Sequence, residues 1–132
     1  MPNPTLQEVV ESSETWVHPG RYAYLKCDEA PVGDHFLVCR DADEVTVITE
    51  ESKIATVKHS ESNEWFKLIE FRVTMPFVTK GFLAKIANAV ASKDLNIMLF
   101  ATYSKDYALV REETADVAIE ALREAGFPVT VL

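Results

Sequence analysis

The sequence is poor in the residues from which nucleotide-binding and catalytic motifs are built. Four glycines in 132 residues leave no phosphate-cradling loop of the GxGxxG or GxxxxGKS type. No serine or cysteine lies in a GxSxG elbow. The three histidines, His18, His35 and His59, are scattered, and no two have the spacing of metal ligands on a helix. We therefore expect a protein without a catalytic centre, a metal or a cofactor.

Basic residues are also scarce. The chain has 13 Lys and Arg against 21 Asp and Glu, which gives a formal net charge of -8. No cluster of Lys or Arg offsets that charge locally, so polyphosphates and anionic membrane surfaces are repelled. We expect neither a nucleic acid nor a membrane as a partner.

Long apolar runs and closely spaced cysteines are absent as well. No run approaches the length needed to cross a bilayer, and the first four residues have neither the basic nor the apolar region of a secretion signal. Cys27 and Cys39 are not a CxxC pair, and no further metal ligand lies near them. We interpret them as two buried thiols in the reducing cytoplasm, with a disulfide between strands as the alternative.

What the sequence does contain is enough apolar residues for a core. Hydrophobic residues make up 48% of the chain, and this length suits one compact unit or two very small halves that share a core. In the first half, the spacing of apolar and β-branched residues predicts a short amphipathic segment and three strands. These cover residues 6–13, 21–27, 35–40 and 44–49. Residues 50–63 are polar and join the halves, with a short helix or strand at 54–57.

The second half has a more regular pattern, in which strands alternate and helices repeat apolar residues every three or four positions. The expected order is strand 65–73, helix 79–93, strand 95–102, strand 107–111, helix 114–125 and strand 127–132. Pro76 ends the first strand, Thr79 is the expected N-cap of the first helix, and Gly126 suits the left-handed position after the second. This βαββαβ order predicts a ferredoxin-like α+β fold, with an antiparallel sheet and both helices on one face.

Two segments of the second half carry candidate binding groups. The first runs from Pro76 to Phe82, where free amides at a helix start attract a carboxylate. Gly81 in the first turn costs helix propensity, which makes sense where a ligand or a neighbouring backbone comes close. The alternative is a simply capped helix that accommodates the glycine by packing.

The second segment, Ala101–Tyr107, is a strand end and turn rich in polar side chains. Asp106 can balance an ammonium group there, with Thr102 hydrogen bonding beside it. The alternative is a solvated hairpin turn, in which geometry alone favours Ser104-Lys105-Asp106.

Taken together, residues 19–128 resemble the small stand-alone ACT-domain proteins. The blocks that carry the resemblance are Pro19–Ala23, Phe36–Ile48, Trp65–Leu68, Thr79–Ala84, Leu95–Ile97 and Thr102–Val110. The last block is the most specific, because Thr102-Tyr103 is followed after two residues by Asp106-Tyr107 and an aliphatic run. It is similar to the corresponding block of aspartate kinase regulatory domains and of the eukaryotic cytosolic arginine sensor.

The resemblance implies tandem ACT units, a partial one at residues 1–63 and a complete one at residues 64–132. It implies a non-catalytic regulatory module that binds an amino acid or a similar small metabolite where two ACT units meet. The alternative is a protein-interaction or structural module that keeps the fold and has lost the pocket. The residues implied to face the ligand are Thr79, Lys80, Gly81, Phe82, Thr102, Tyr103, Lys105 and Asp106, with Asn96 and Ile97 reaching it from the neighbouring unit. We also expect a homodimer, or a tight pseudo-dimer of the two halves, because edge strands rich in Val, Ile and Phe need a partner.

Overall fold

The computed structural model describes residues 4–73 and 79–132. The chain forms two compact units, which we call unit 1 and unit 2. Unit 1 joins the residues up to Pro19 to Lys67–Leu132, and unit 2 is Gly20–Phe66. Strand β5 (Glu61–Arg72) passes from one unit to the other, so its first half belongs to unit 2 and its second half to unit 1.

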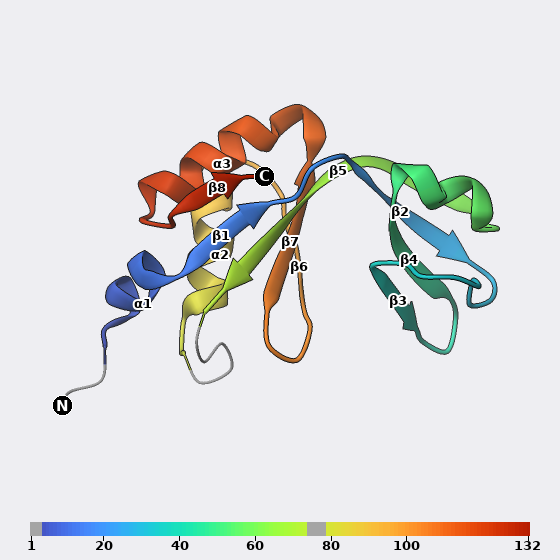
Figure 1. Cartoon of the computed structure of the whole chain (residues 1–132), viewed down its shortest axis with the longest axis horizontal. Helices are drawn as coiled ribbons and strands as arrows, with labels where there is room; N and C mark the ends of the chain where they lie inside the picture. The colour runs from blue at the N-terminus through green and yellow to red at the C-terminus, as the bar shows by residue number, and fades with distance from the viewer. Residues whose placement is uncertain (1–3, 74–78) are drawn as a thin grey trace. The chain divides into compact units, whose positions relative to one another are not determined.

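Unit 1 combines a sheet with all the α-helices among the described residues (Figure 1). Besides β5, its elements are α1 (Leu6–Ser12), β1 (Glu14–Val17), α2 (Phe82–Ala91), β6 (Met98–Ala101), β7 (Asp106–Arg111), a 3-10 turn (Glu112–Thr114), α3 (Ala115–Glu124) and β8 (Val129–Val131). The order β5, α2, β6, β7, α3, β8 is βαββαβ, so the predicted fold class is confirmed. Across the sheet of unit 1 the strands follow the order β6, β7, β5, β1, β8.

The four-residue strand β1 is missing from the sequence prediction. It pairs with β5 in antiparallel fashion and with β8 in parallel fashion, with Thr15 opposite both Phe71 and Val129. One strand pair is therefore parallel in a sheet that we expected to be antiparallel throughout. Because β1 lies between β5 and β8, the N-terminal residues group with the C-terminal part, which differs from the predicted division at residues 63 and 64. Four residues before a Pro-Gly break give too short an alternation to indicate a strand.

The core of unit 1 draws apolar side chains from α1, β1, β5, α2, β7, α3 and the segment before β8. At its centre, Phe71, Phe82 and Phe127 meet edge to face, with ring centroids 5.6 to 6.4 Å apart. Such aromatic pairs contribute about 0.5–1.5 kcal/mol beyond the area they bury. The side chain of Phe82 therefore serves the core of unit 1.

Helix α2 begins later than predicted, and the expected cap is wrong. Gly81, not Thr79, is the N-cap residue; its φ is +85° and no side chain caps it. A side chain at this φ is strained, and a Cβ would lie 3.2 Å from Cδ2 of Leu6 in α1. Backbone conformation and the close approach of α1 thus account for the glycine. The predicted strand end at Pro76 lies outside the described residues.

Helix α3 agrees with the prediction to within a residue at each end. Gly126 follows it with φ +100°, the left-handed conformation expected of a glycine after a helix. The N–H of Phe127 then donates to the carbonyl of Leu122, which ends the helix and turns the chain toward β8.

Unit 2 is a sheet without an α-helix. Its elements are β2 (Tyr22–Cys27), β3 (Leu37–Arg40), β4 (Val45–Glu50), a 3-10 turn (Glu51–Thr56) and the first half of β5. The strands follow the order β3, β4, β2, β5, and each pair is antiparallel. One face carries a small core of Ala23, Leu25, Cys27, Val45, Val47 and Val57. Like the partial N-terminal unit that we expected, unit 2 lacks a full helix, but it covers Gly20–Phe66 and not residues 1–63.

The two cysteines differ in exposure. Cys27 is buried and Cys39 is exposed, and both thiols are free. The prediction of two buried thiols is therefore right for Cys27 and wrong for Cys39, which lies on β3 at the edge of the sheet. Burial, reinforced by the charge of Asp28, raises the pKa of the Cys27 thiol.

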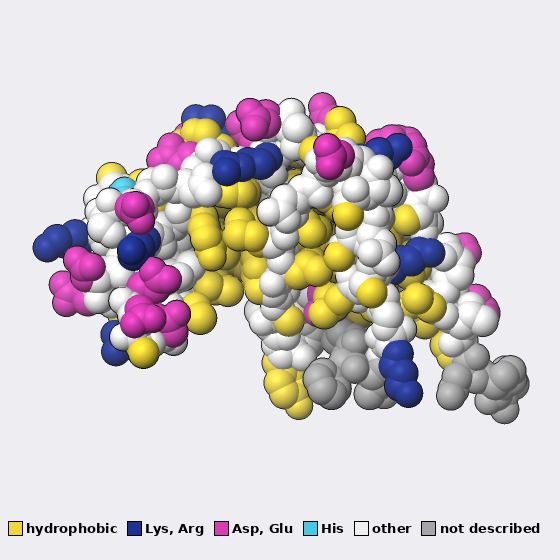
Figure 2. Space-filling model, turned by 180° about the vertical axis from the view of Figure 1, so that it is seen from behind, with side chains coloured by type: hydrophobic (Ala, Val, Ile, Leu, Met, Phe, Trp, Pro, Cys, Tyr) yellow, Lys and Arg dark blue, Asp and Glu magenta, His cyan; other side chains and the backbone are white. Residues whose placement is uncertain are grey.

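The surface has the charge distribution that the composition indicates. On the face drawn in Figure 2, acidic side chains are widespread, while the Lys and Arg side chains of the described residues stand apart from one another. None of the described helices is long and apolar enough to cross a membrane.

Candidate functional site

The predicted site residues come from two segments of unit 1. Figure 1 shows the turn between β6 and β7 at the same end of this unit as the start of α2. We call this region, made of residues 79–82 and 101–106, the α2 end of unit 1. The structure thus brings the two predicted segments to one end of one unit.

Asp106, the first residue of β7, is the unusual group at this end. It is 6% exposed, and its Oδ2 atom has no hydrogen-bond partner among the described residues. Its side chain shares a face with Ala108 and Val110, which belong to the core beneath the helices. Burial raises the pKa of this carboxyl group. A buried carboxylate without a partner is costly, so Asp106 favours either a proton or a cationic group beside it.

The rest of the β6–β7 turn is open to solvent. The N–H of Thr102 donates to the carbonyl of Lys105 at 3.0 Å and closes the turn. Thr102 is exposed, Tyr103 is fully exposed, and Lys105 is half-buried. The hairpin interpretation therefore describes residues 102–105, whereas Asp106 is buried and differs from a solvated turn residue.

The start of α2 offers backbone groups. The first intrahelical bond runs from the N–H of Lys85 to the carbonyl of Gly81, at 2.9 Å. The N–H groups of the residues between them have no partner within the helix, as at any helix start, and they carry partial positive charge. Lys80 and Gly81 are exposed and the Phe82 side chain is buried. What this segment can give a ligand is therefore its amides.

Asn96 and Ile97 lie in the loop before β6, since that strand begins at Met98. The Asn96 side-chain oxygen accepts a hydrogen bond from the N–H of Ile97 at 2.8 Å. Asn96 is exposed and Ile97 packs against the core of unit 1. Their expected role, to reach a ligand held by a neighbouring unit, stays a prediction.

A second polar cluster in unit 1 is one that the sequence prediction missed. Glu70 in β5 is 4% exposed; its Oε1 lies 2.8 Å from Nε2 of His18, and its Oε2 accepts from Nε of Arg72. The Arg72 guanidinium lies 3.9 Å above the ring of Trp16 in β1. Burial acts to raise the pKa of Glu70, but its bonds to Arg72 and His18 outweigh burial and hold the pKa below its ordinary value.

This cluster explains why a charged residue is tolerated at a buried position near the end of β5. Its signal in the sequence is Glu70 between the apolar residues Ile69 and Phe71, with a cation two residues away. The second partner, His18, directly follows β1, a strand that was not predicted, so the cluster was not predictable as a whole. All its members are engaged with one another, which indicates a structural role.

Among residues 4–73 and 79–132, no three His, Cys, Asp or Glu side chains gather closely enough to hold a metal ion.

Comparison with known proteins supports the resemblance read from the sequence. Residues 61–124 match the family model of the ACT domain, so the resemblance is confirmed over that part of the chain. The matched segment contains β5, α2, β6, β7 and α3, and with them the α2 end of unit 1. A search of curated proteins returns no match.

Several crystal structures share the fold. A protein of unknown function from Vibrio cholerae, described as a possible transport protein, is 23% identical with a TM-score of 0.79; the alignment covers 92% of this chain and 96% of that one. A protein from Agrobacterium tumefaciens is 17% identical with a TM-score of 0.71, over 98% and 96% of the two chains. The regulatory subunit of aspartate kinase from Thermus thermophilus, in its ligand-free form, is 14% identical with a TM-score of 0.63, over 89% and 97%. At these identities the likeness establishes the fold alone.

Proposed function

We propose that this protein is a regulatory module of the cytoplasm that binds a small metabolite, an amino acid or a close analogue, and catalyses no reaction. The ACT-domain match and the fold shared with an aspartate kinase regulatory subunit support a regulatory role. Nucleophile elbows and phosphate-cradling loops are absent from the sequence, and no metal-ligand group occurs among the described residues.

The observation that carries the proposal is the Oδ2 atom of buried Asp106, which has no hydrogen-bond partner within residues 4–73 and 79–132. In the proposed complex, the ammonium group of the ligand pairs with this carboxylate. The carboxylate of the ligand accepts hydrogen bonds from the amides that begin α2, where the helix dipole favours an anion. The two groups lie at the same end of unit 1 (Figure 1), as one ligand that carries both charges requires.

The roles of the surrounding residues follow from their exposure. Thr79, Lys80 and Gly81 precede the helix start, and Thr102, Tyr103 and Lys105 surround the turn before Asp106. In the proposed assembly, a homodimer, these exposed and half-buried groups face the ligand and the second copy, which contributes Asn96 and Ile97. Burying the fully exposed ring of Tyr103 against a partner would favour that assembly.

The proposal is tested by a thermal-shift screen of the full chain against the twenty amino acids, followed by calorimetry. A ligand present at 100 times its Kd stabilises the native state by about 2.7 kcal/mol, which a melting curve resolves easily. The key variant is Asp106→Asn, which keeps the shape of the side chain and removes its charge.

For Asp106→Asn we expect two opposite effects. Since burial raises the pKa of Asp106, the charged form costs folding free energy at neutral pH, and the variant should melt at a higher temperature than the wild type without ligand. It should also lose the ligand-induced rise in melting temperature. An unchanged affinity in the variant would remove Asp106 from the site. If no amino acid stabilises the wild type, the interaction module becomes the better interpretation.

A further inference from the structure

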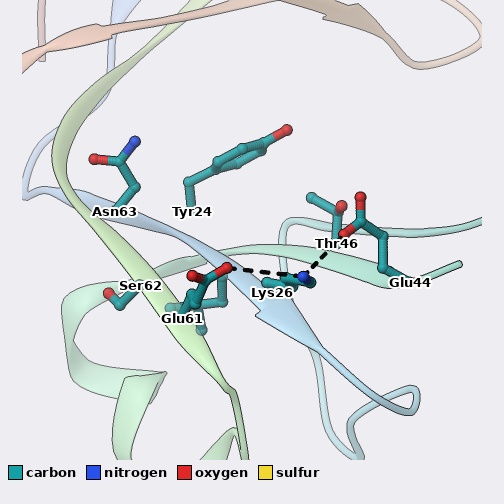
Figure 3. A pocket seen from close by; sticks show the side chains of 8 residues that line it. Tyr24, Lys26, Glu44, Thr46, Glu61, Ser62 and Asn63 are labelled. Carbon is teal, nitrogen blue, oxygen red and sulfur yellow. Dashed lines mark ion pairs between the residues drawn. The ribbon is translucent and has the colours of Figure 1, made fainter.

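Unit 2 has a hollow of its own on the face of its sheet opposite its core. The hollow has a volume of about 380 Å³ and is lined by side chains from β2, β4 and β5 and from the residue before β4 (Figure 3). The ones that matter here are Tyr24, Lys26, Glu44, Thr46, Glu61 and Asn63. The strand register places Lys26 opposite both Thr46 and Glu61, and Tyr24 opposite Asn63. Since Leu25 and Cys27 point into the core, Tyr24 and Lys26 point into the hollow.

The charges in the hollow are only loosely paired. The Nζ atom of Lys26 lies 3.8 Å from Oε2 of Glu44 and 3.8 Å from Oε2 of Glu61. Both distances exceed the 2.7–3.2 Å of a hydrogen bond, so the ammonium keeps its donors and each carboxylate keeps its acceptors. The three groups together carry one net negative charge, and the side chain of Lys26 is 49% exposed. A ligand can reach all three groups.

Neutral groups complete the lining. They include Tyr24 and Thr46, whose side chains end in hydroxyl groups, and Asn63. The ring of Tyr24 packs edge to face against Phe66, with centroids 6.5 Å apart, which holds the aromatic wall of the hollow in place. Figure 3 shows the ring of Tyr24 standing beside Asn63, with Lys26 between Glu61 and Glu44.

We propose that this hollow is a second binding site, which takes a small zwitterion. A simple anion is repelled by the two carboxylates, and a simple cation pairs with a carboxylate but leaves the donors of Lys26 unused. A molecule that carries both charges satisfies all three groups: its carboxylate accepts from Lys26, and its ammonium donates to Glu61 or Glu44 and lies near the Tyr24 ring. The volume falls within the range of small-molecule sites, which begins at about 300 Å³. The proposal goes beyond the function proposed above, because it uses no residue of unit 1.

The test is a titration of the full chain followed by ¹H–¹⁵N correlation spectra, with β-alanine as the probe. Propylamine and propanoate have the same three-carbon skeleton and one charge each, so they are the matched controls. We expect β-alanine to shift the amide signals of Lys26, Thr46 and Asn63 in a saturable way, and the controls to bind more weakly. Equal binding of either single-charge control, or no saturable shift at those signals up to the solubility of the probe, would overturn the proposal.

Variants of the charged residues test whether Lys26 and Glu61 bind β-alanine. Lys26→Met and Glu61→Gln should each lower the affinity for β-alanine about fivefold, the effect of losing one partly exposed ion pair. Lys58→Met removes another exposed lysine of unit 2 that does not line the hollow, and should leave the affinity unchanged. Equal affinity in wild type and Lys26→Met would contradict the proposed pairing.

Asp106→Asn separates this site from the one in unit 1. If both proposals hold, the variant loses the binding at the α2 end and keeps the β-alanine shifts of unit 2. If only the function proposed above fails, the shifts at Lys26, Thr46 and Asn63 remain. If those shifts disappear in Asp106→Asn, the hollow is not an independent site and the present proposal is wrong.

Discussion

Each unit of this protein contains an arginine that stacks on a tryptophan and pairs with a glutamate. In unit 1, Arg72 lies 3.9 Å above Trp16 and bonds to Glu70, whose side chain is 5% exposed. In unit 2, Arg21 lies 4.2 Å above Trp65 and its Nη2 is 2.6 Å from Oε2 of Glu51, whose side chain is 52% exposed.

The same three residue types therefore contribute differently to the stability of the two units. A half-exposed ion pair is screened by water and contributes little, whereas removing the partner of a buried carboxylate leaves an uncompensated charge. Burial of the glutamate, more than the contacts themselves, therefore determines what each cluster contributes to folding.

The contributions of the two clusters can be measured by replacing each arginine with methionine, which removes the charge and retains the apolar stem. Arg72→Met should lower the free energy of unfolding by about 2–3 kcal/mol, because Glu70 keeps only His18 as a partner. Arg21→Met should lower it by less than about 1 kcal/mol. Urea denaturation of both variants at neutral pH measures the difference, and equal losses would refute the argument from burial.

The stability of the protein should also depend on pH through the buried carboxylate of Glu70. The pKa of Glu70 is held below its ordinary value of 4.5, so its stabilising contribution is complete above that pH. The contribution is lost as the pH falls through the lower value in the folded state. Glu70→Gln should therefore lose stability at neutral pH and decline less steeply than the wild type in acid. Urea midpoints recorded from about pH 7 to about pH 3 provide the check; parallel curves would show that Glu70 is not the group responsible.

The two units can also be compared at two glycines, where we expect substitution to change the stability by a smaller amount. Gly81 in unit 1 and Gly20 in unit 2 have φ of +85° and +75°. Replacing Gly20 by Ala should cost about 1 kcal/mol through the left-handed conformation alone, because nothing lies within 4 Å of the added Cβ. Gly81→Ala should cost about 0.5–1 kcal/mol more, since its Cβ would press on Leu6 at 3.2 Å. Thermal melting of the two variants measures the excess, and a double variant with Leu6→Ala should remove it.

The sequence was a good guide where a pattern is local and long. The βαββαβ order, helix α3 and the glycine that follows it were predictable, because ten-residue amphipathic segments and alternating strands carry their own signal.

What the sequence did not reveal depends on contacts between distant residues. Strand β1 forms because β5 and β8 pair with it on either side, and a pattern of four residues is too short to predict that arrangement. The shift of the α2 cap from Thr79 to Gly81 depends on α1, and the ion pair of Glu70 depends on a histidine 52 positions away. Asp106 was recognised as a candidate from its motif, but its burial and missing partner became visible only in the folded chain.

Strands β1 and β5 join the two units of the chain. The second half of β5 pairs with β1 in antiparallel fashion, and the N–H of His18 donates to the carbonyl of Leu68 at 2.9 Å. The chain therefore leaves unit 1 at Pro19 and returns at Lys67 on adjacent strands. In topological terms, β1 and β5 form a hairpin, and the whole of unit 2 is an insertion in its loop. An insertion whose two ends meet on one pair of strands can vary in sequence or length without disturbing the register of the host sheet.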